Sequence, residues 1–376
     1  MRVVMLGWEF PPFRSGGLGV HCYELTHHLV NKGVSIDFYM PKTGHKIRSE
    51  GSVNIIEIGA EPSLSPYSRG NPKNKVYDLD FFDAVDRYNA RCVEIVKGDC
   101  DLVHCHDWIT IRAGIQLKKL TGKSLIFTVH STEYDRTGNI NPLGWIVDIE
   151  KEGIKKADRI ITVSKRMKGR LIELYGADPD KIKVIYNGVN LARFMGKKRA
   201  GEKIVLFLGR LTTQKGPEFF IRAAERVLEK EPDAKFIVCG TGDLLPRLIK
   251  LTIDLGLMDK VTFTGFVSDE EVAKLYSISD VYVMPSVSEP FGITVLEAMS
   301  SGTPTIISKE SGVSEALAHC LKVDFWDVNE LANKIIALLR YRPLNHHLSE
   351  NGIDEAREFT WETTADKTFA LYKEVC

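Results

Sequence analysis

The 376-residue chain has no hydrophobic run long enough to span a membrane, and its apolar N-terminal stretch is too short for a signal peptide. It also lacks an excess of charge of either sign, because 50 lysines and arginines balance 50 aspartates and glutamates. A formal charge of zero gives no reason to expect nucleic acid as a partner. These absences predict a cytoplasmic protein.

Two further patterns are missing. The seven cysteines are scattered and form no Cys-x-x-Cys pair, so neither a disulfide framework nor a thiolate zinc site is expected. The glycine-rich loops lack the full Gly-x-Gly-x-x-Gly fingerprint of dinucleotide-binding enzymes. An oxidoreductase with a nicotinamide cofactor is therefore not favoured, and no cofactor is predicted.

Apolar strands alternate with amphipathic helices along the chain, which is typical of a parallel sheet covered by helices on both faces. A polar, charged segment at 196–203 interrupts this alternation, which then restarts. The sequence therefore predicts an α/β protein with two doubly wound, Rossmann-like domains, at 1–195 and 196–358. Ligands of such sheets bind beyond the carboxyl ends of the strands, so we expect a site in a cleft that both domains face.

The segment at 281–300 predicts a strand, a turn and a helix, with two carboxylates placed around a Pro-Phe-Gly turn. Glu289 would lie at the sheet edge, and Glu297 about two helical turns further on. The backbone amides of residues 291–293 would form the helix N-terminus, which favours a sugar phosphate or another anion. The competing interpretation is a surface turn with two solvated acids.

Two cations lie on the loop after the first strand of the second domain. Arg210 and Lys215 belong to Gly-Arg-Leu-Thr-Thr-Gln-Lys-Gly at 209–216. A diphosphate suits the fork of an arginine together with the point charge of a lysine. In the first domain, Gly16 and Gly17 would let backbone amides approach a phosphate closely.

Three histidines near predicted strand ends are further candidates. His104 and His106 share one face of a strand, but zinc needs three or four convergent ligands and no obvious partners are present. We therefore expect pocket or packing roles for this pair and predict no metal site. His130 ends a buried strand, where polar residues of parallel sheets often contact ligands. Asp-x-Asp occurs three times and is interpreted as structural each time: at 78–80, 99–101 and 178–180.

Five ordered motifs resemble the retaining nucleotide-sugar glycosyltransferases of the GT-B fold, in the family 4-like group that contains glycogen synthases and sucrose-synthase-like enzymes. They are Gly-Gly-Leu-Gly at 16–19, His-Asp-Trp at 106–108, Asn-Gly-Val at 187–189, Gly-Arg-Leu with Gln-Lys-Gly at 209–216, and Glu-Pro-Phe-Gly with Glu at 289–297. The resemblance covers nearly the whole chain. It implies a hexosyltransferase that takes a UDP- or ADP-sugar as donor and a carbohydrate as acceptor.

The resemblance also implies roles for the donor-binding residues. Arg210 and Lys215 would bind the diphosphate, Glu289 would hold hydroxyls of the donor sugar, and Glu297 would bond the ribose. Backbone amides from two loops would contact sugar or phosphate: those of Gly17, Phe291, Gly292 and Ile293.

For the first domain, the resemblance places His130 beside the donor hexose and Asp107 on the acceptor side. It implies that residues 359–376 form a helix that crosses back onto the first domain. The long non-periodic stretch at 58–74 is predicted to line the acceptor side as a functional loop.

The mechanism implied is transfer with retention and without a metal, because cations and helix amides can stabilise the leaving diphosphate. Arg14 stands where glycogen synthases typically have a lysine, and the chain is short for a glycogen synthase. Whether the acceptor is an α-glucan therefore stays open. A lipid-directed glycosyltransferase is an alternative, because basic and apolar residues interleave at 165–175. Membrane contact is not favoured, since a solvated helix with a buried stripe gives the same pattern. A small-molecule acceptor, a nucleotide-sugar 2-epimerase and a non-catalytic nucleotide-sugar-binding protein are the remaining alternatives. An intact set of donor residues argues against the last.

Overall fold

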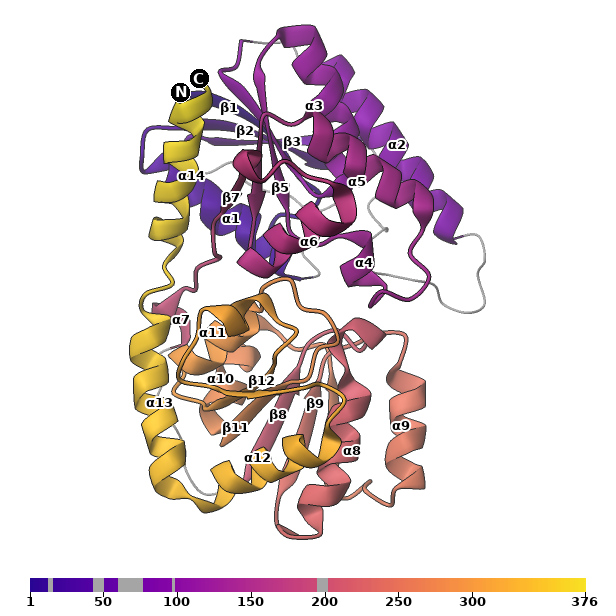
Figure 1. The fold of residues 1–376 in the computed structure, drawn as a ribbon, viewed down its shortest axis with the longest axis vertical. Coiled ribbons are helices and arrows are strands. Elements are labelled where there is room, and N and C mark those ends of the chain that lie inside the picture. Colours follow the sequence, from indigo (N-terminus) through magenta and orange to yellow (C-terminus); the bar gives the residue numbers. More distant parts are fainter. Residues whose placement is uncertain (13–15, 43–50, 60–76, 97–98, 195–201) are drawn as a thin grey trace. The chain divides into compact units, whose positions relative to one another are not determined.

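The computed structural model describes residues 1–12, 16–42, 51–59, 77–96, 99–194 and 202–376 (Figure 1). They form two compact units. The first comprises 1–134, 139–187 and 361–376, and the second comprises 135–138 and 188–360. The predicted domain boundary at 195/196 and most of the predicted loop at 58–74 lie outside the described residues.

The first unit contains a seven-stranded parallel sheet with the order β3-β2-β1-β4-β5-β6-β7. Its strands are β1 (Arg2–Leu6), β2 (Ser35–Pro41), β3 (Val53–Ile58), β4 (Leu102–His106), β5 (Ser124–Val129), β6 (Arg159–Thr162) and β7 (Ile182–Val184). The winding direction reverses between β1 and β4, which are hydrogen-bonded neighbours. Such a reversal is the point where open α/β sheets bind ligands.

Helices cover both faces of this sheet. They are α1 (Gly17–Val30), α2 (Tyr77–Ile95), α3 (Trp108–Thr121), α5 (Gly144–Lys156), α6 (Lys165–Tyr175) and α14 (Trp361–Val375). Helix α1 packs against α14, whereas α3 packs against α2 and α5, and Figure 1 shows these two groups on opposite sides of the strands. The C-terminal helix α14 thus belongs to the same compact unit as the N-terminal strand.

The second unit contains a six-stranded parallel sheet with the order β10-β9-β8-β11-β12-β13. Its strands are β8 (Ile204–Leu208), β9 (Lys235–Cys239), β10 (Val261–Gly265), β11 (Val281–Met284), β12 (Thr305–Ser308) and β13 (Leu321–Val323). The winding direction reverses between β8 and β11. The predicted fold class, two doubly wound Rossmann-like α/β domains, is confirmed.

The helices of the second unit are α7 (Leu191–Phe194), α8 (Pro217–Leu228), α9 (Leu245–Asp254), α10 (Asp269–Ile278), α11 (Ile293–Ser300), α12 (Val328–Arg340) and α13 (Arg342–Ala356). Short helical turns complete the described elements: α4 (Glu133–Arg136), η1 (Pro179–Lys181), η2 (Thr213–Lys215) and η3 (Gly312–Glu315). Helix α8 packs against α9 and α12, and α11 packs against α10 and α13.

Local chemistry explains where the elements begin and end. Helix α6 begins after Ser164, whose hydroxyl accepts the backbone N–H of Met167 at 3.0 Å, and it ends at Gly176 in the left-handed conformation. All four residues of β11 are buried, as expected for an apolar run in a sheet covered on both faces. All seven cysteines carry free thiols, and six of them are buried. They fill core space as small apolar residues do.

Candidate active site

The strongest grouping of sequence-predicted residues lies at the reversal point of the second sheet. The loop after β8 carries Arg210 and Lys215, and the loop after β11 carries Glu289. Because β8 and β11 are adjacent parallel strands, both loops leave the sheet at the same edge. Residues about 75 positions apart in the sequence therefore meet where a ligand of this fold is expected.

A close backbone contact holds these two loops together. Gly216 ends the η2 turn with φ +65°, and a β-carbon at this position would come within 2.1 Å of the carbonyl oxygen of Pro285. Only glycine combines the left-handed conformation with so close an approach. Gln214 reinforces the contact, since its carbonyl oxygen accepts the backbone N–H of Val287 at 2.9 Å.

Lys215 and Glu289 form an ion pair across the two loops: the ammonium of Lys215 donates a hydrogen bond to Oε2 of Glu289. The side chain of Lys215 is 20 % exposed and that of Glu289 is 9 % exposed. Both charges are thus partly removed from water, and each is compensated by the opposite charge of the other. The hydroxyl of Ser286 lies 3.5 Å from the same carboxylate oxygen.

Arg210 stands on the same loop, with its guanidinium 3.3 Å from Oε1 of Gln214. The structure therefore places two cations and one carboxylate on adjacent loops of one sheet edge. Cations in this position can neutralise phosphate oxygens, whereas the carboxylate can accept hydrogen bonds from hydroxyl groups.

The predicted strand, turn and helix around Glu289 are present as β11, a loop and α11. The backbone of Glu289 is fixed on both sides, because its N–H donates to Glu310 O at 3.1 Å and its carbonyl accepts from Gly312 N at 2.8 Å. Gly292 precedes α11 with φ +114°, a conformation that suits glycine. Phe291 and Gly292 are buried and Ile293 is half-buried, so the start of α11 is held in packed surroundings.

Glu297 lies in α11, where it is half-buried and hydrogen-bonded. The hydroxyl of Tyr276 lies 3.1 Å from Oε2 of Glu297 and 3.1 Å from the carbonyl of Thr294. Burial, together with the negative charge of Glu297, raises the pKa of Tyr276 well above its ordinary value. Tyr276 therefore remains a protonated donor that orients Glu297, a role that its sequence position alone does not reveal.

In the first unit the corresponding reversal point lies between β1 and β4. Gly17 begins α1 after the loop that follows β1, and a β-carbon at Gly16 would meet no atom within 4 Å. Arg14 and Ser15 lie outside the described residues. Among the described residues, open space thus surrounds Gly16 at the beginning of α1.

Asp107 follows β4 and is buried, with φ +59°. Its Oδ1 accepts the backbone N–H of His130 at 2.7 Å and that of Ser131 at 3.2 Å. These bonds attach the loop after β5 to the end of β4. The position predicted for the acceptor side therefore also fixes the backbone of His130.

The structure separates the roles of His104 and His106. His104 is buried, and its two ring nitrogens lie 2.6 Å from the Tyr372 hydroxyl and 2.7 Å from the Thr128 hydroxyl. These contacts connect β4 with α14 and β5. His104 is thus a packing residue, as predicted.

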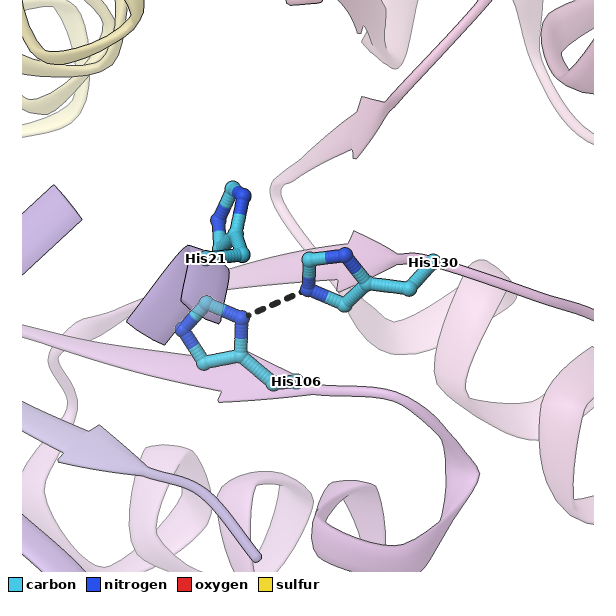
Figure 2. A group of neighbouring side chains, drawn as sticks. All are labelled: His21, His106 and His130. Carbon is cyan, nitrogen blue, oxygen red and sulfur yellow. Dashed lines mark hydrogen bonds between the residues drawn. The ribbon is translucent and has the colours of Figure 1, made fainter. Parts of the chain in front are cut away.

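His106 instead belongs to a cluster that the sequence interpretation missed. The side chains of His21, from α1, His106, from the end of β4, and His130, after β5, point toward one another (Figure 2). The expectation that His106 has no convergent partners was wrong. Spacing could not reveal the cluster, because its members come from three elements that only the fold brings together.

All three imidazoles of this cluster are kept neutral. Burial lowers the pKa of His21 to about 4, and burial with neighbouring imidazoles lowers the pKa values of His106 and His130 well below the ordinary value. At neutral pH each ring therefore offers a lone pair on one nitrogen.

The structure also shows where the residues of α6 and of the Asp-x-Asp segments lie. On α6, Met167 and Leu171 are buried whereas Ile172 and Leu174 are exposed, so part of its apolar pattern faces the core. Among the Asp-x-Asp segments, Asp101 accepts the backbone N–H of Arg2 at 2.7 Å and Asp178 caps the η1 turn.

Comparison with known families covers both units. Residues 15–193 match the Glycosyltransferase Family 4 model, and residues 190–355 match the model described as Glycosyl transferases group 1. An uncharacterized glycosyltransferase of Methanocaldococcus jannaschii is 31% identical over 99% of this chain and 98% of that protein. The chain belongs to this glycosyltransferase family.

Other relatives of the glycosyltransferase differ in their acceptors. It is 27% identical to a glycogen synthase of Mycobacterium tuberculosis and 26% identical to a D-inositol 3-phosphate glycosyltransferase of Corynebacterium diphtheriae. Each alignment covers 99% of this chain and 94% of the relative. The family is therefore clear, whereas these two names point to different acceptors.

Solved structures support the same fold. Sucrose-phosphate synthase from Thermosynechococcus elongatus superposes with a TM-score of 0.85 at 23% identity, over 99% of this chain and 98% of that one. Anabaena HepE, in complex with UDP and glucose, gives 0.76 at 17% identity over 100% of both chains. The catalytic domain of Arabidopsis thaliana starch synthase IV, bound to ADP and acarbose, gives 0.76 at 16% identity over 100% and 99%. The glycosyltransferase has the GT-B fold.

Within the described part of the chain, no helix combines the length and the apolar character needed to cross a bilayer.

Proposed function

We propose that this glycosyltransferase moves a hexose, glucose in the first instance, from a nucleotide-diphosphate sugar to a hydroxyl group of a carbohydrate acceptor, with retention of configuration. The observation that carries the proposal is the pairing of Lys215 with Glu289 beside Arg210, at the reversal point of the second sheet. This one edge combines phosphate-binding cations with a carboxylate able to hold sugar hydroxyls.

The cations would act on the leaving group. When the bond between the anomeric carbon and the phosphate oxygen breaks, negative charge develops on the departing diphosphate. Arg210, Lys215 and the amides at residues 291–293 would stabilise that charge. The site is partly desolvated around Lys215, which strengthens the interaction relative to water.

Glu289 would act on the sugar. Its carboxylate would accept hydrogen bonds from donor hydroxyls and favour the positive charge that develops on the ring. Glu297, oriented by Tyr276, would bond the ribose. The acceptor oxygen would bond to the anomeric carbon on the face that the diphosphate leaves, and its proton would pass to the departing phosphate oxygen.

In the first unit, His130 would lie beside the donor hexose, and Asp107 would lie on the acceptor side. Asp107 is suited to fix the loop of His130, because its Oδ1 accepts that residue's backbone N–H. The nucleobase stays open between uracil and adenine, since fold neighbours are bound to UDP in one case and to ADP in another.

The acceptor has two candidates. The glycogen synthase relative supports an α-glucan, and the inositol phosphate relative supports a small phosphorylated alcohol. Exposed Ile172 and Leu174 on the basic helix α6 support a lipid-linked acceptor as a further alternative. An epimerase would need no acceptor at all.

The test is to incubate the protein with UDP-glucose or ADP-glucose and, separately, an α-glucan, inositol phosphate or a lipid acceptor. We expect release of nucleoside diphosphate that depends on one acceptor class, together with a glycoside detected by mass spectrometry. Proton NMR of the first-formed glycoside should show the α configuration of the donor. The Lys215→Ala variant serves as the matched control and should form little product.

Three results would contradict the proposal. A β-linked product from an α-linked donor would overturn retention. Conversion of the nucleotide sugar into its epimer without transfer would indicate an epimerase. Absence of turnover with every nucleotide-sugar and acceptor pair would remove hexosyl transfer as the activity.

A further inference from the structure

A compact group of three histidines lies in the first unit. Each of His21, His106 and His130 offers one ring nitrogen, and these three atoms lie within 4.8 Å of one another (Figure 2). His21 and His106 are buried and His130 is half-buried. Their side chains come from α1, from the end of β4 and from the loop after β5, so the sheet edge itself holds them together.

The hydrogen bonds within the group leave ring nitrogens unpaired. His106 Nδ1 and His130 Nε2 lie 3.0 Å apart and share one proton. His21 Nδ1 lies 2.7 Å from Oδ1 of Asn187, to which it can only donate. The buried Nε2 atoms of His21 and His106 then have no hydrogen-bond partner among the described residues. An unpaired nitrogen in such surroundings is costly, so Nε2 of His21 points to a missing ligand. His106 would offer Nδ1, the atom that faces His130.

We propose that His21, His106 and His130 form a binding site for a transition-metal ion of the Zn²⁺ class, with three imidazole ligands and one open coordination position. Three protein nitrogens and an open position are the arrangement of non-structural zinc sites.

The distances suit a small ion after a modest adjustment. Tetrahedral zinc with bonds of about 2.0–2.1 Å holds its ligand nitrogens about 3.3 Å apart. His106 Nδ1 and His130 Nε2 already lie 3.0 Å apart. The third nitrogen must approach by at most roughly 1.5 Å, which a change in the His21 side-chain torsions can provide.

Asn187 would contact one of the ligands rather than the metal itself. By accepting the Nδ1 proton of His21, it fixes the tautomer that directs the Nε2 lone pair toward the other two rings. His104 is not a ligand, because both of its ring nitrogens are bonded to hydroxyl groups. The site thus consists of three ligands and one orienting amide.

The site has a consequence that rests on the proposed function. A metal bound at His130 would hold the side chain that the proposed function places beside the donor hexose. We therefore expect Zn²⁺ to lower transfer activity and a chelator to restore it. Binding itself is independent of activity, so it can be tested without a known acceptor.

The experiment is a titration of the metal-free 376-residue chain with Co²⁺ alone, followed by visible absorption and isothermal calorimetry. We expect one equivalent of Co²⁺ per chain, with the intense visible bands of four- or five-coordinate cobalt, and loss of those bands when Zn²⁺ is added. His21→Ala should abolish the bands. Asn187→Ala keeps all three ligands and should weaken Co²⁺ binding by about 10- to 100-fold.

A matched control removes a histidine pair of the second unit. The rings of His319 and His347 lie 6.0 Å apart in the second unit. A variant with both residues changed to asparagine should bind Co²⁺ as the wild type does. Circular dichroism of each metal-free variant establishes that it is folded, and Asn187→Ala supplies the test if His21→Ala does not fold.

The proposal is overturned if the wild type shows no stoichiometric cobalt bands. It is equally overturned if the bands persist unchanged in both His21→Ala and Asn187→Ala, or if they disappear in the control that lacks His319 and His347. None of these results depends on glycosyl transfer, so failure of the metal site leaves the proposed function untouched.

Discussion

Lys215 and Glu289 are ion-paired although 74 positions separate them in the chain. The contact arises because the strands that precede them, β8 and β11, are neighbours in the sheet. Each partner compensates the other while both are largely withdrawn from water. A bound diphosphate would pair with Lys215 in place of Glu289, whose carboxylate could then accept hydrogen bonds from sugar hydroxyls. The ion pair would thus couple binding of the diphosphate to binding of the donor sugar.

Loss of either cation should remove most transfer activity. We expect Arg210→Ala and Lys215→Ala each to lose about 2–4 kcal/mol of transition-state stabilisation, roughly 30- to 900-fold in kcat/KM. The measurement is steady-state kinetics with the nucleotide sugar that the wild type accepts. Lys309→Ala is the matched control, because this half-exposed lysine also pairs with a carboxylate, Asp324.

The two variants should differ in stability. Lys215→Ala leaves the buried carboxylate of Glu289 without its ammonium partner, so its denaturant midpoint should fall, whereas that of Arg210→Ala should change little. Adding Glu289→Gln to Lys215→Ala should recover part of the lost stability and no activity. Kinetics close to wild type in both single variants would refute the diphosphate assignment.

Glu289→Gln should reduce turnover more than Glu297→Gln does. The first substitution removes the charge that would favour the developing positive charge on the sugar ring. In the second, the amide oxygen can still accept the hydrogen bond of Tyr276. Single-turnover rates at saturating donor compare the two directly. A fully active Glu289→Gln variant would remove the role given to this residue.

Transfer should persist in the presence of EDTA. In the proposed mechanism cations and helix amides would neutralise the leaving group, so the reaction would need no Mg²⁺ or Mn²⁺. Initial rates before and after chelation, and after readdition of each metal, provide the measurement. Loss of activity with EDTA and its recovery with Mg²⁺ or Mn²⁺ would show that the reaction depends on a metal.

Gly216→Ala should destabilise the second unit and weaken donor binding. The residue adopts φ +65°, and its new β-carbon would lie 2.1 Å from the carbonyl oxygen of Pro285. Gly256→Ala is the matched control, because Gly256 has φ +68° and a β-carbon added there would meet no atom within 4 Å. The control should lose about 1–2 kcal/mol from backbone strain alone, and Gly216→Ala should lose more. Equal denaturant midpoints would show that the loop contact is unimportant.

Glu231 should stabilise the second unit in a pH-dependent way. Its carboxylate bonds Lys203 at 2.5 Å and also Arg340, and these bonds hold its pKa below the ordinary 4.5. A depressed folded-state pKa contributes stability that is fully present above pH 4.5 and is lost as the pH falls through the lower folded value. Glu231→Gln should cost about 1–3 kcal/mol at neutral pH, a difference that narrows in acid.

The measurement for Glu231 is urea unfolding of wild type and variant across this pH range. Glu202→Gln is the control, since Glu202 pairs with Lys235 while it is two-thirds exposed, and an exposed pair should contribute little. A gap between wild type and Glu231→Gln that stays constant as the pH falls would contradict the assignment.

Much of the fold follows from local sequence. The strand predicted at the start of 281–300 and the helix pattern at 165–175 are present as β11 and α6, because buried strands in a parallel sheet are continuous apolar runs and α6 has a serine cap and a terminal glycine. Helices α2, α5, α12 and α13 and strands β3 and β13 were not predicted. Helices α12 and α13 follow one another directly, with only Tyr341 between them, so no turn signal separates them in the sequence.

The sequence by itself determined the fold class and the family, since alternating strand and helix patterns and ordered motifs are properties of neighbouring residues. Only the tertiary structure decided which side chains meet. It places Lys215 beside Glu289 and Tyr276 beside Glu297, and it brings the side chains of His21, His106 and His130 close together. The physical reason is that contacts across a sheet edge depend on strand order, and strand order is set by the packing of the whole domain rather than by any local stretch of the chain.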